Sequence, residues 1–219
     1  MIEAVLFDLD GTLADTAPDL CGALNRLLGE EGLKPLALAQ LRPHVSNGAR
    51  GLIGAGFGLT PQDAGYPRLQ QRFLALYEQH ICVDSRLFDG MTELLGDIET
   101  AKLRWGIVTN KPEKYTRKVV AGLNLEQRAA CVVSGDSTPN PKPHPEPLLL
   151  ACRLAGVNPQ HTLYIGDDLR DVQAGHAAGI RTIAAAWGYL GDGLPIEQWK
   201  ADGIVVHPTD VLRLIKAAC

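Results

Sequence analysis

Short apolar runs that end in polar or glycine-rich residues recur along the 219-residue chain. Runs of this kind are typical of strands that are buried on both faces of a sheet. Their polar ends mark the points where the strands stop. We predict strands at residues 3–10, 104–110, 130–136, 162–168 and 181–187, and a weaker one at 203–207.

Helical patterns lie between most of these runs. Residues 91–103 and 145–156 carry apolar positions at helical spacing. Strands that alternate with helices predict an α/β fold built on a doubly wound parallel sheet, that is, a Rossmann-like core.

The interval between the first two strands is too long for a single crossover helix. It contains four further helical patterns, at residues 18–33, 38–45, 49–56 and 66–81. We therefore predict an α-helical cap domain at residues 15–88, inserted into the Rossmann-like core, which is made of residues 1–14 and 89–219. The insertion leaves the core at the edge where ligands bind to open parallel sheets, so it is placed to form a lid.

Composition limits the partners of the chain. Hydrophobic residues make up 46% and charged residues 21%, as in soluble globular proteins. The formal net charge of −4 argues against nucleic acid or an anionic membrane as the main partner. The start of the chain lacks the basic residues and long apolar stretch of a signal peptide, and no run is long enough to span a membrane, so we expect a cytoplasmic protein.

The cysteine pattern agrees with that location. The five cysteines are odd in number, scattered and without a Cys-x-x-Cys pair: Cys21, Cys82, Cys131, Cys152 and Cys219. Such a pattern indicates reduced thiols rather than a disulfide framework or a zinc site.

Two acids, Asp8 and Asp10, stand where the first apolar run ends, in FDLDGT at residues 7–12. Burying an ionised carboxylate is costly unless it is paired or bound to a cation. Alternation along an extended chain puts both acids on one side, and Gly11 then allows a sharp turn. Two such acids can hold one Mg²⁺ ion; the alternative is a solvated turn or a helix cap.

A second acid group follows the strand predicted at 162–168. In YIGDDLRD, Asp167 and Asp168 come directly after Gly166, and Asp171 lies one helical turn later. One of them can cap the next helix, but three acids within five residues exceed what capping needs. They would repel the first pair unless a divalent ion and a lysine offset the charge.

Three other polar residues stand at strand ends or in the loops that follow. Lys142 lies in the proline-rich NPKPHPEP, and an ammonium held near acids can bind phosphate. Thr109 and Asn110 end the second strand of the predicted sheet and can donate hydrogen bonds to phosphate oxygens. The alternatives are a solvated lysine and two helix-capping residues.

Taken together, these motifs resemble the haloacid dehalogenase superfamily of phosphohydrolases. The similarity rests on FDLDGT, the Thr-Asn strand end, the downstream Lys142 and GDDLRD, in that order. It covers nearly the whole chain, and the helical insertion resembles the smaller cap type of the superfamily.

The resemblance implies a mechanism. Asp8 would attack phosphorus and form an aspartyl phosphate, and Asp10 would protonate the leaving alkoxide and then activate water. Mg²⁺ would be held by Asp8, the backbone carbonyl of Asp10 and Asp167, with Asp168 or Asp171 supporting it. Thr109 and Lys142 would hold the phosphoryl oxygens, with the remaining substrate contacts from Gly11, Asn110, Ser46, Asn47 and Arg50.

Asp10 favours phosphate ester chemistry over the dehalogenases and phosphonatases, which are similar but lack the second acid. A sugar phosphomutase shares all the motifs and stays an alternative. A catalytically silent binding module is disfavoured because no motif position is lost. We expect an enzyme whose partner is a small-molecule phosphate ester, working as a monomer or a homodimer.

Other details narrow the substrate to two candidates. FDGMTELL, TNKP, KPHPEPLLLA and the Gly-Tyr-Leu at 188–190 are similar to phosphoglycolate phosphatases. GDDLRD is similar to the phosphatases that act on N-acetylmuramic acid 6-phosphate. Both substrates carry a carboxylate, which Arg50 in the predicted cap could bind through two hydrogen bonds if its loop faces the active site; the alternative is a solvated surface arginine.

Overall fold

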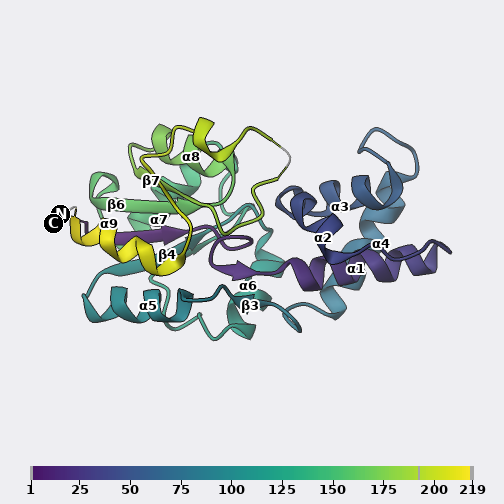
Figure 1. The fold of residues 1–219 in the computed structure, drawn as a ribbon, viewed down its shortest axis with the longest axis horizontal. Helices are drawn as coiled ribbons and strands as arrows, with labels where there is room; N and C mark the ends of the chain where they lie inside the picture. Colours follow the sequence, from purple (N-terminus) through teal and green to yellow (C-terminus); the bar gives the residue numbers. More distant parts are fainter. Residues whose placement is uncertain (1, 192, 218–219) are drawn as a thin grey trace.

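The protein was analysed as a computed structural model that describes residues 2–191 and 193–217. Figure 1 shows an α/β body on one side and a group of helices on the other. The strands of the body are β1 (Ala4–Phe7), β4 (Arg104–Val108), β5 (Val132–Val133), β6 (Thr162–Gly166), β7 (Arg181–Ala185) and β8 (Gly203–Val205). They form one sheet in the order β5-β4-β1-β6-β7-β8, and every neighbouring pair is parallel. The predicted doubly wound parallel sheet is confirmed.

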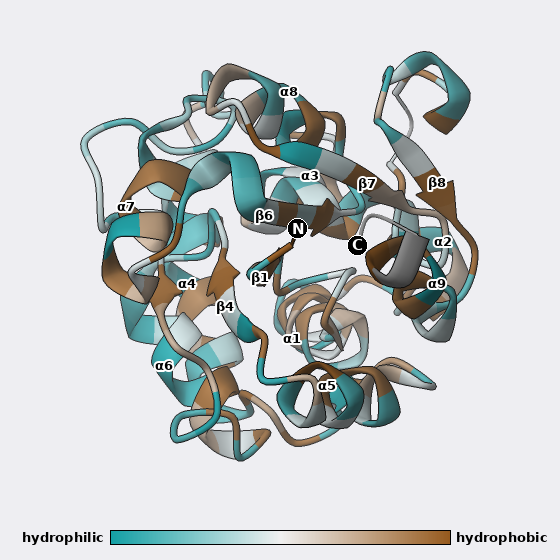
Figure 2. Cartoon of the chain, turned by 90° about the vertical axis from the view of Figure 1, so that its left-hand side faces the viewer, coloured by the Kyte–Doolittle hydropathy of each residue, from teal (hydrophilic) through white to brown (hydrophobic). Residues whose placement is uncertain are grey.

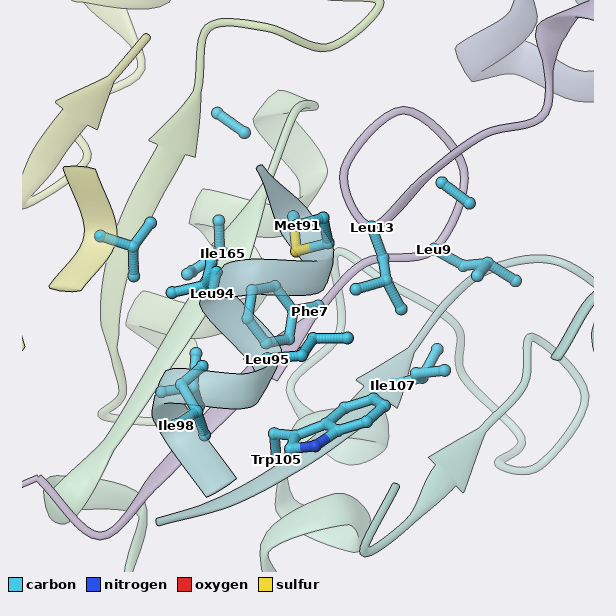
Figure 3. Packing of buried hydrophobic residues seen from close by; sticks show 14 of the residues in the cluster. Phe7, Leu9, Leu13, Met91, Leu94, Leu95, Ile98, Trp105, Ile107 and Ile165 are labelled. Carbon is cyan, nitrogen blue, oxygen red and sulfur yellow. The ribbon is translucent and has the colours of Figure 1, made fainter. Parts of the chain in front are cut away.

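Strand β1 is buried on both faces because it lies in the middle of this sheet. Its four residues are all fully buried. Val5 and Phe7 point into a cluster that includes residues of α5 (Met91–Thr100), α6 (Glu113–Gly122) and α9 (Val211–Ala217), and Figure 3 shows Phe7 at its centre. Leu6 points to the other face, against α7 (Glu146–Ala155) and α8 (Leu169–Ala177). In Figure 2 the strands β1, β4 and β6 carry apolar residues between the surrounding helices.

The predicted insertion consists of α1 (Ala17–Glu30), α2 (Leu38–Leu41), a 3₁₀ helix (Arg42–Asn47), α3 (Gly48–Phe57) and α4 (Tyr66–Gln79). We call these segments the insertion helices. They have an apolar cluster of their own, which includes Leu24, Leu27 and Phe73. The division into domains at residues 15 and 88 stays a prediction.

Two predicted elements are present but differ in extent or type from the prediction. The helix predicted at 38–45 is a single α turn followed by the 3₁₀ helix, because Pro43 has no N–H for a continuing α-helix. The strand predicted at 130–136 pairs with β4 only at Val132 and Val133.

A small antiparallel pair that the sequence did not predict joins the two ends of the insertion. Strand β2 (Ala14–Asp15) pairs with β3 (Arg86–Leu87). Beside it, the buried carboxylate of Asp19 accepts hydrogen bonds from the backbone N–H groups of Asp84 and Ser85, both at 2.9 Å, and from the Ser85 hydroxyl at 2.6 Å. Asp19 thus ties the first turn of α1 to the returning chain.

Cys21, Cys82, Cys131 and Cys152 are free thiols, as predicted. Burial raises the pKa of Cys21 and of Cys131 to about 12, which keeps both thiols protonated. Cys219 lies outside the described residues. In the part of the chain that the structure describes, no helix has the length and apolarity needed to cross a membrane.

We expect Asp19→Ala to lower the free energy of unfolding by about 2–4 kcal/mol, because two backbone N–H groups and a hydroxyl, those of Ser85 buried, lose a charged acceptor. Urea unfolding measures this. The control, Asp63→Ala, removes an exposed carboxylate that accepts only from Thr60, and should cost less than about 1 kcal/mol. Equal losses in the two variants would contradict the role given to Asp19.

Candidate active site

The polar residues at the strand ends meet at one edge of the sheet. Asp8 follows β1, Thr109 follows β4 and Asp167 follows β6. Since β1 lies between β4 and β6, these residues lie side by side, as expected for the carboxyl ends of parallel strands. Together with Asp10, they line a cavity of about 380 Å³.

Lys142 is the cation at the centre of this edge. Its side chain is only 3% exposed, and its Nζ lies 3.0 Å from Asp8 Oδ1 and 2.7 Å from Asp171 Oδ1. The ammonium also donates to the carbonyl of Val108 at 3.0 Å and to the hydroxyl of Tyr164 at 2.8 Å. Burial lowers the pKa of Lys142, but Asp171 and Asp8 outweigh that effect and raise it. Lys142 therefore stays charged.

Three carboxylates gather around this lysine. Asp8, Asp167 and Asp171 each bring an oxygen within 4.8 Å of the others. Burial, reinforced by neighbouring carboxylates, raises the pKa of Asp8 to about 7 despite Lys142, and it raises that of Asp167 well above its usual range. Buried oxygens that resist ionisation in this way are the ligand set that a small divalent cation stabilises, so the site fits Mg²⁺.

Asp167 is held by the residues packed around it. Its carboxylate accepts hydrogen bonds from the Thr12 hydroxyl at 2.7 Å and from the Tyr189 backbone N–H at 2.8 Å. A Cβ atom at Gly11 would lie 2.2 Å from its Oδ2, and one at Gly188 would lie 2.1 Å from its Cβ. Both positions must therefore be glycine.

Gly11 is not among the residues that line the cavity, and its substrate contact stays a prediction. Its φ of +87° makes the turn after Asp10, and its N–H donates to the carbonyl of Ala14 at 3.0 Å. Gly11 thus shapes the backbone turn that follows Asp10.

Asn110 contacts the loop that carries Lys142, and its predicted contact with substrate stays a prediction. Its side chain donates to the Lys142 carbonyl at 2.8 Å and accepts from the Lys142 N–H at 2.9 Å. These two bonds fix the loop that carries Lys142, although Asn110 also lines the cavity. Thr109 lines the cavity too, and its hydroxyl accepts the N–H of Lys111 at 3.1 Å.

Asp168 and Asp171, which the sequence left as alternatives, serve separate purposes. Asp168 caps α8 by accepting from the Arg170 N–H at 2.8 Å, and its carboxylate also pairs with the Arg170 guanidinium at 2.7 Å. Asp171 belongs to the carboxylate group around Lys142. Arg170 in turn donates to the Ser46 carbonyl at 2.8 Å, which joins the core to the insertion helices.

Asp10 is paired with a residue that the sequence prediction missed. Lys111 Nζ lies 2.8 Å from Asp10 Oδ1, with side-chain exposures of 7% and 18%. The Thr16 hydroxyl donates to the same oxygen. The available signal was the TNKP segment, which places this lysine directly after Asn110.

The insertion helices form the opposite wall of the cavity. Ser46, Asn47 and Arg50 line it, so the loop in which we placed the cap contacts faces the same space as Asp8. The rest of that wall is mostly apolar and includes Leu20, Val45, Phe73, Leu74 and Tyr77. What these residues bind stays a prediction.

Tyr189 was missed as well. Its hydroxyl accepts from the backbone N–H groups of Thr16 at 2.8 Å and of Ala17 at 2.9 Å, and donates to Asp15 at 3.0 Å. It therefore supports the start of α1, while its own N–H holds Asp167. The sequence analysis noted the Gly-Tyr-Leu at 188–190 only as a similarity, and no pattern in the sequence indicates these contacts.

Comparisons with known proteins agree with this geometry. The family model for haloacid dehalogenase-like hydrolases matches residues 5–185. An N-acetylmuramic acid 6-phosphate phosphatase of Pseudomonas putida is 41% identical over 217 residues, covering 99% of this chain and 97% of the relative. A phosphoglycolate phosphatase of Xanthomonas campestris is 45% identical over 206 residues, covering 94% of this chain and 92% of the relative.

Solved structures show the same fold. A crystal structure described as a predicted phosphoglycolate phosphatase from Haemophilus somnus aligns with a TM-score of 0.84 at 27% identity, and the alignment covers 97% of each chain.

We predict that Mg²⁺ raises the melting temperature by about 5 °C or more near pH 8, and by clearly less near pH 5.5. The pKa of Asp8 is raised from 3.8 to about 7. Between pH 3.8 and about 7, Asp8 is protonated in the metal-free folded state but ionised in the unfolded state. The stability of the metal-free protein therefore falls as pH rises through this range. At lower pH Mg²⁺ must displace those protons.

Thermal unfolding in Mg²⁺ and in chelator, at both pH values, measures the effect. The matched variant Asp8→Asn should show a smaller shift with less dependence on pH. A wild-type shift that is equal at the two pH values would argue against binding at this carboxylate group.

Proposed function

We propose a reaction for this chain from one premise: it belongs to the haloacid dehalogenase-like hydrolase family, and its curated relatives are phosphatases. It is a phosphatase that acts on a phosphate ester. The finer proposal is a Mg²⁺-dependent phosphomonoester hydrolase that works through an aspartyl phosphate. The observation that carries it is that Asp8 and Asp10 line one cavity, with Lys142 Nζ 3.0 Å from Asp8.

In the first step, the Asp8 carboxylate attacks phosphorus. A bond forms between Asp8 and phosphorus while the bond from phosphorus to the leaving oxygen breaks, and Asp10 gives that oxygen a proton. Asp8 Oδ1 accepts from the Leu9 N–H at 2.8 Å, which helps to orient the carboxylate. Lys142 and Thr109 stabilise the charge on the phosphoryl group.

In the second step, Asp10 takes a proton from a water molecule that attacks the aspartyl phosphate. The bond between Asp8 and phosphorus breaks, inorganic phosphate leaves and both carboxylates return to their starting states. Bound Mg²⁺ would supply positive charge for the phosphoryl oxygens. Asp8, Asp167 and the backbone carbonyl of Asp10 would hold it, with Asp171 in support.

The substrate we propose is a small organic phosphate that also carries a carboxylate. Relatives named for phosphoglycolate and for N-acetylmuramic acid 6-phosphate support this class, as does the place of Arg50 on the cavity wall. We propose phosphoglycolate first. The cavity of about 380 Å³ and its apolar wall favour the amino-sugar phosphate as a second candidate, because a two-carbon leaving group would fill little of that space.

The insertion helices act, in this proposal, as a cap that closes the cavity over the substrate. The Arg170 bond to the Ser46 carbonyl is a contact that such closure would use. The cytoplasmic location and the monomeric or dimeric state stay predictions, and a sugar phosphomutase stays the less favoured alternative.

We expect Asp8→Asn to lower kcat by on the order of a thousandfold or more, because an amide is a poor nucleophile. Its melting temperature should not fall, since the change removes a buried charge. Asp10→Asn should also be impaired, through loss of the acid and base. Phosphate release from both candidate substrates and from an aryl phosphate, with and without Mg²⁺, measures this.

Asp63→Asn, which alters an exposed aspartate in the insertion, serves as the control and should turn over like the wild type. Phosphate release by Asp8→Asn close to the wild-type rate would exclude covalent catalysis by Asp8.

A further inference from the structure

Tyr77 presents an unpartnered hydroxyl group at the active-site cavity. The residue lies near the end of α4, lines the cavity and is 2% exposed. Among the described residues, its hydroxyl has no hydrogen-bond partner and almost no solvent contact. Burial raises the pKa of Tyr77 to about 12 despite Lys111, so the hydroxyl is a neutral donor near pH 7.

Lys111 offers further unused donors next to it. An ammonium carries three N–H donors. Lys111 donates one to Asp10 Oδ1 at 2.8 Å, and its ammonium also lies beside the Tyr77 hydroxyl, without the geometry of a hydrogen bond. Its Nζ lies over the Tyr77 ring, 4.9 Å from the centroid, and Lys111 also lines the cavity.

Lys142 is the internal comparison for Lys111. Both lysines line the same cavity and are almost fully buried. Lys142 donates to a carbonyl, a hydroxyl and the Asp171 carboxylate, and lies against Asp8. Among the described residues, every donor of Lys142 thus has a partner, whereas Lys111 makes one well-formed hydrogen bond, to Asp10.

A buried donor without an acceptor destabilises the folded protein, and native structures contain few of them. Phenylalanine would fill the same volume as Tyr77 without that cost. Donors of Tyr77 and Lys111 that make no well-formed hydrogen bond therefore lie together beside Asp10, on two residues that line the cavity. Their chemistry calls for an oxygen acceptor, neutral or anionic.

We propose that Tyr77 and Lys111 form a subsite for a substrate oxygen attached to the carbon adjacent to the phosphorylated carbon. The inference rests on the proposed function, which puts the leaving oxygen at Asp10. Lys111 Nζ is 2.8 Å from Asp10. A substrate oxygen on the next carbon after the leaving oxygen's own carbon is therefore within reach of Lys111. Phosphoglycolate offers a carboxylate oxygen there, and a sugar 6-phosphate offers its ring oxygen.

The test compares kcat/KM for phosphoglycolate, N-acetylmuramic acid 6-phosphate and ethyl phosphate, which lacks such an oxygen. In Tyr77→Phe, the ratio of kcat/KM for the preferred oxygen-bearing substrate to that for ethyl phosphate should fall about tenfold. A larger fall for phosphoglycolate would identify the bound oxygen as a carboxylate oxygen. A larger fall for N-acetylmuramic acid 6-phosphate would identify it as the ring oxygen.

Tyr66→Phe is the matched control, since it makes the same change in the same helix at a residue that does not line the cavity. Its ratio should stay at the wild-type value. Without substrate, Tyr77→Phe should melt roughly 2–4 °C above the wild type, because it loses an unsatisfied buried hydroxyl.

Two results would overturn the subsite. One is a wild-type ratio in Tyr77→Phe, and the other is a lower melting temperature, which would mean that the hydroxyl has a structural partner. Failure of the proposed function is distinguishable from both, since the wild-type enzyme would then release phosphate from none of the three esters, whereas failure of the subsite alone leaves the wild-type turnover intact.

Discussion

Negative charge concentrated at the end of β1 is the constraint on which the rest of the site depends. Asp8, Asp167 and Asp171 bring oxygens within 4.8 Å of one another where little water reaches, and such a group is stable only beside cations. Lys142 supplies one buried positive charge, and Asn110 fixes its loop. Gly11 and Gly188 leave room for Asp167 to reach the same point. The fold thus maintains a carboxylate group and a buried lysine that fit the divalent cation and the phosphate of the proposed reaction.

A second charge pair, Asp10 with Lys111, lies on the side of the cavity that faces the insertion helices. Tyr77 of α4 covers Lys111, and Thr16, next to α1, donates to Asp10. Tyr189 and Arg170 of the core contact the insertion at Thr16 and at Ser46. The residue proposed to handle the proton is therefore held by the core and the insertion together, which would couple proton transfer to the position of the cap.

The strand ends were predictable from sequence because buried strands have a strong local signature, and Asp8, Asp10 and Asp167 interrupt that signature with charge. The parallel order of the strands then brings these three aspartates together at one edge of the sheet. Lys111 and Tyr189 were not predictable in the same way, since their partners Asp10 and Asp167 are remote in the chain and no local pattern reports such contacts. The substrate contact of Asn110 stays a prediction, and no local pattern indicated that its amide also holds the Lys142 loop. The apolar spacing predicted one helix at 38–45, but the α-helix ends at Leu41, shortly before Pro43.

The central claim, that Asp8 becomes phosphorylated, is tested most directly in Asp10→Asn with an aryl phosphate and Mg²⁺. An aryl oxide leaves without a proton, so the first step can proceed, while the second step lacks the base that activates water. Intact-mass measurement after an acid quench should show a gain of one phosphoryl group, located on Asp8 by peptide mapping. Release of the aryl alcohol over many turnovers with no phosphorylated protein, or a phosphoryl group on another residue, would contradict the account.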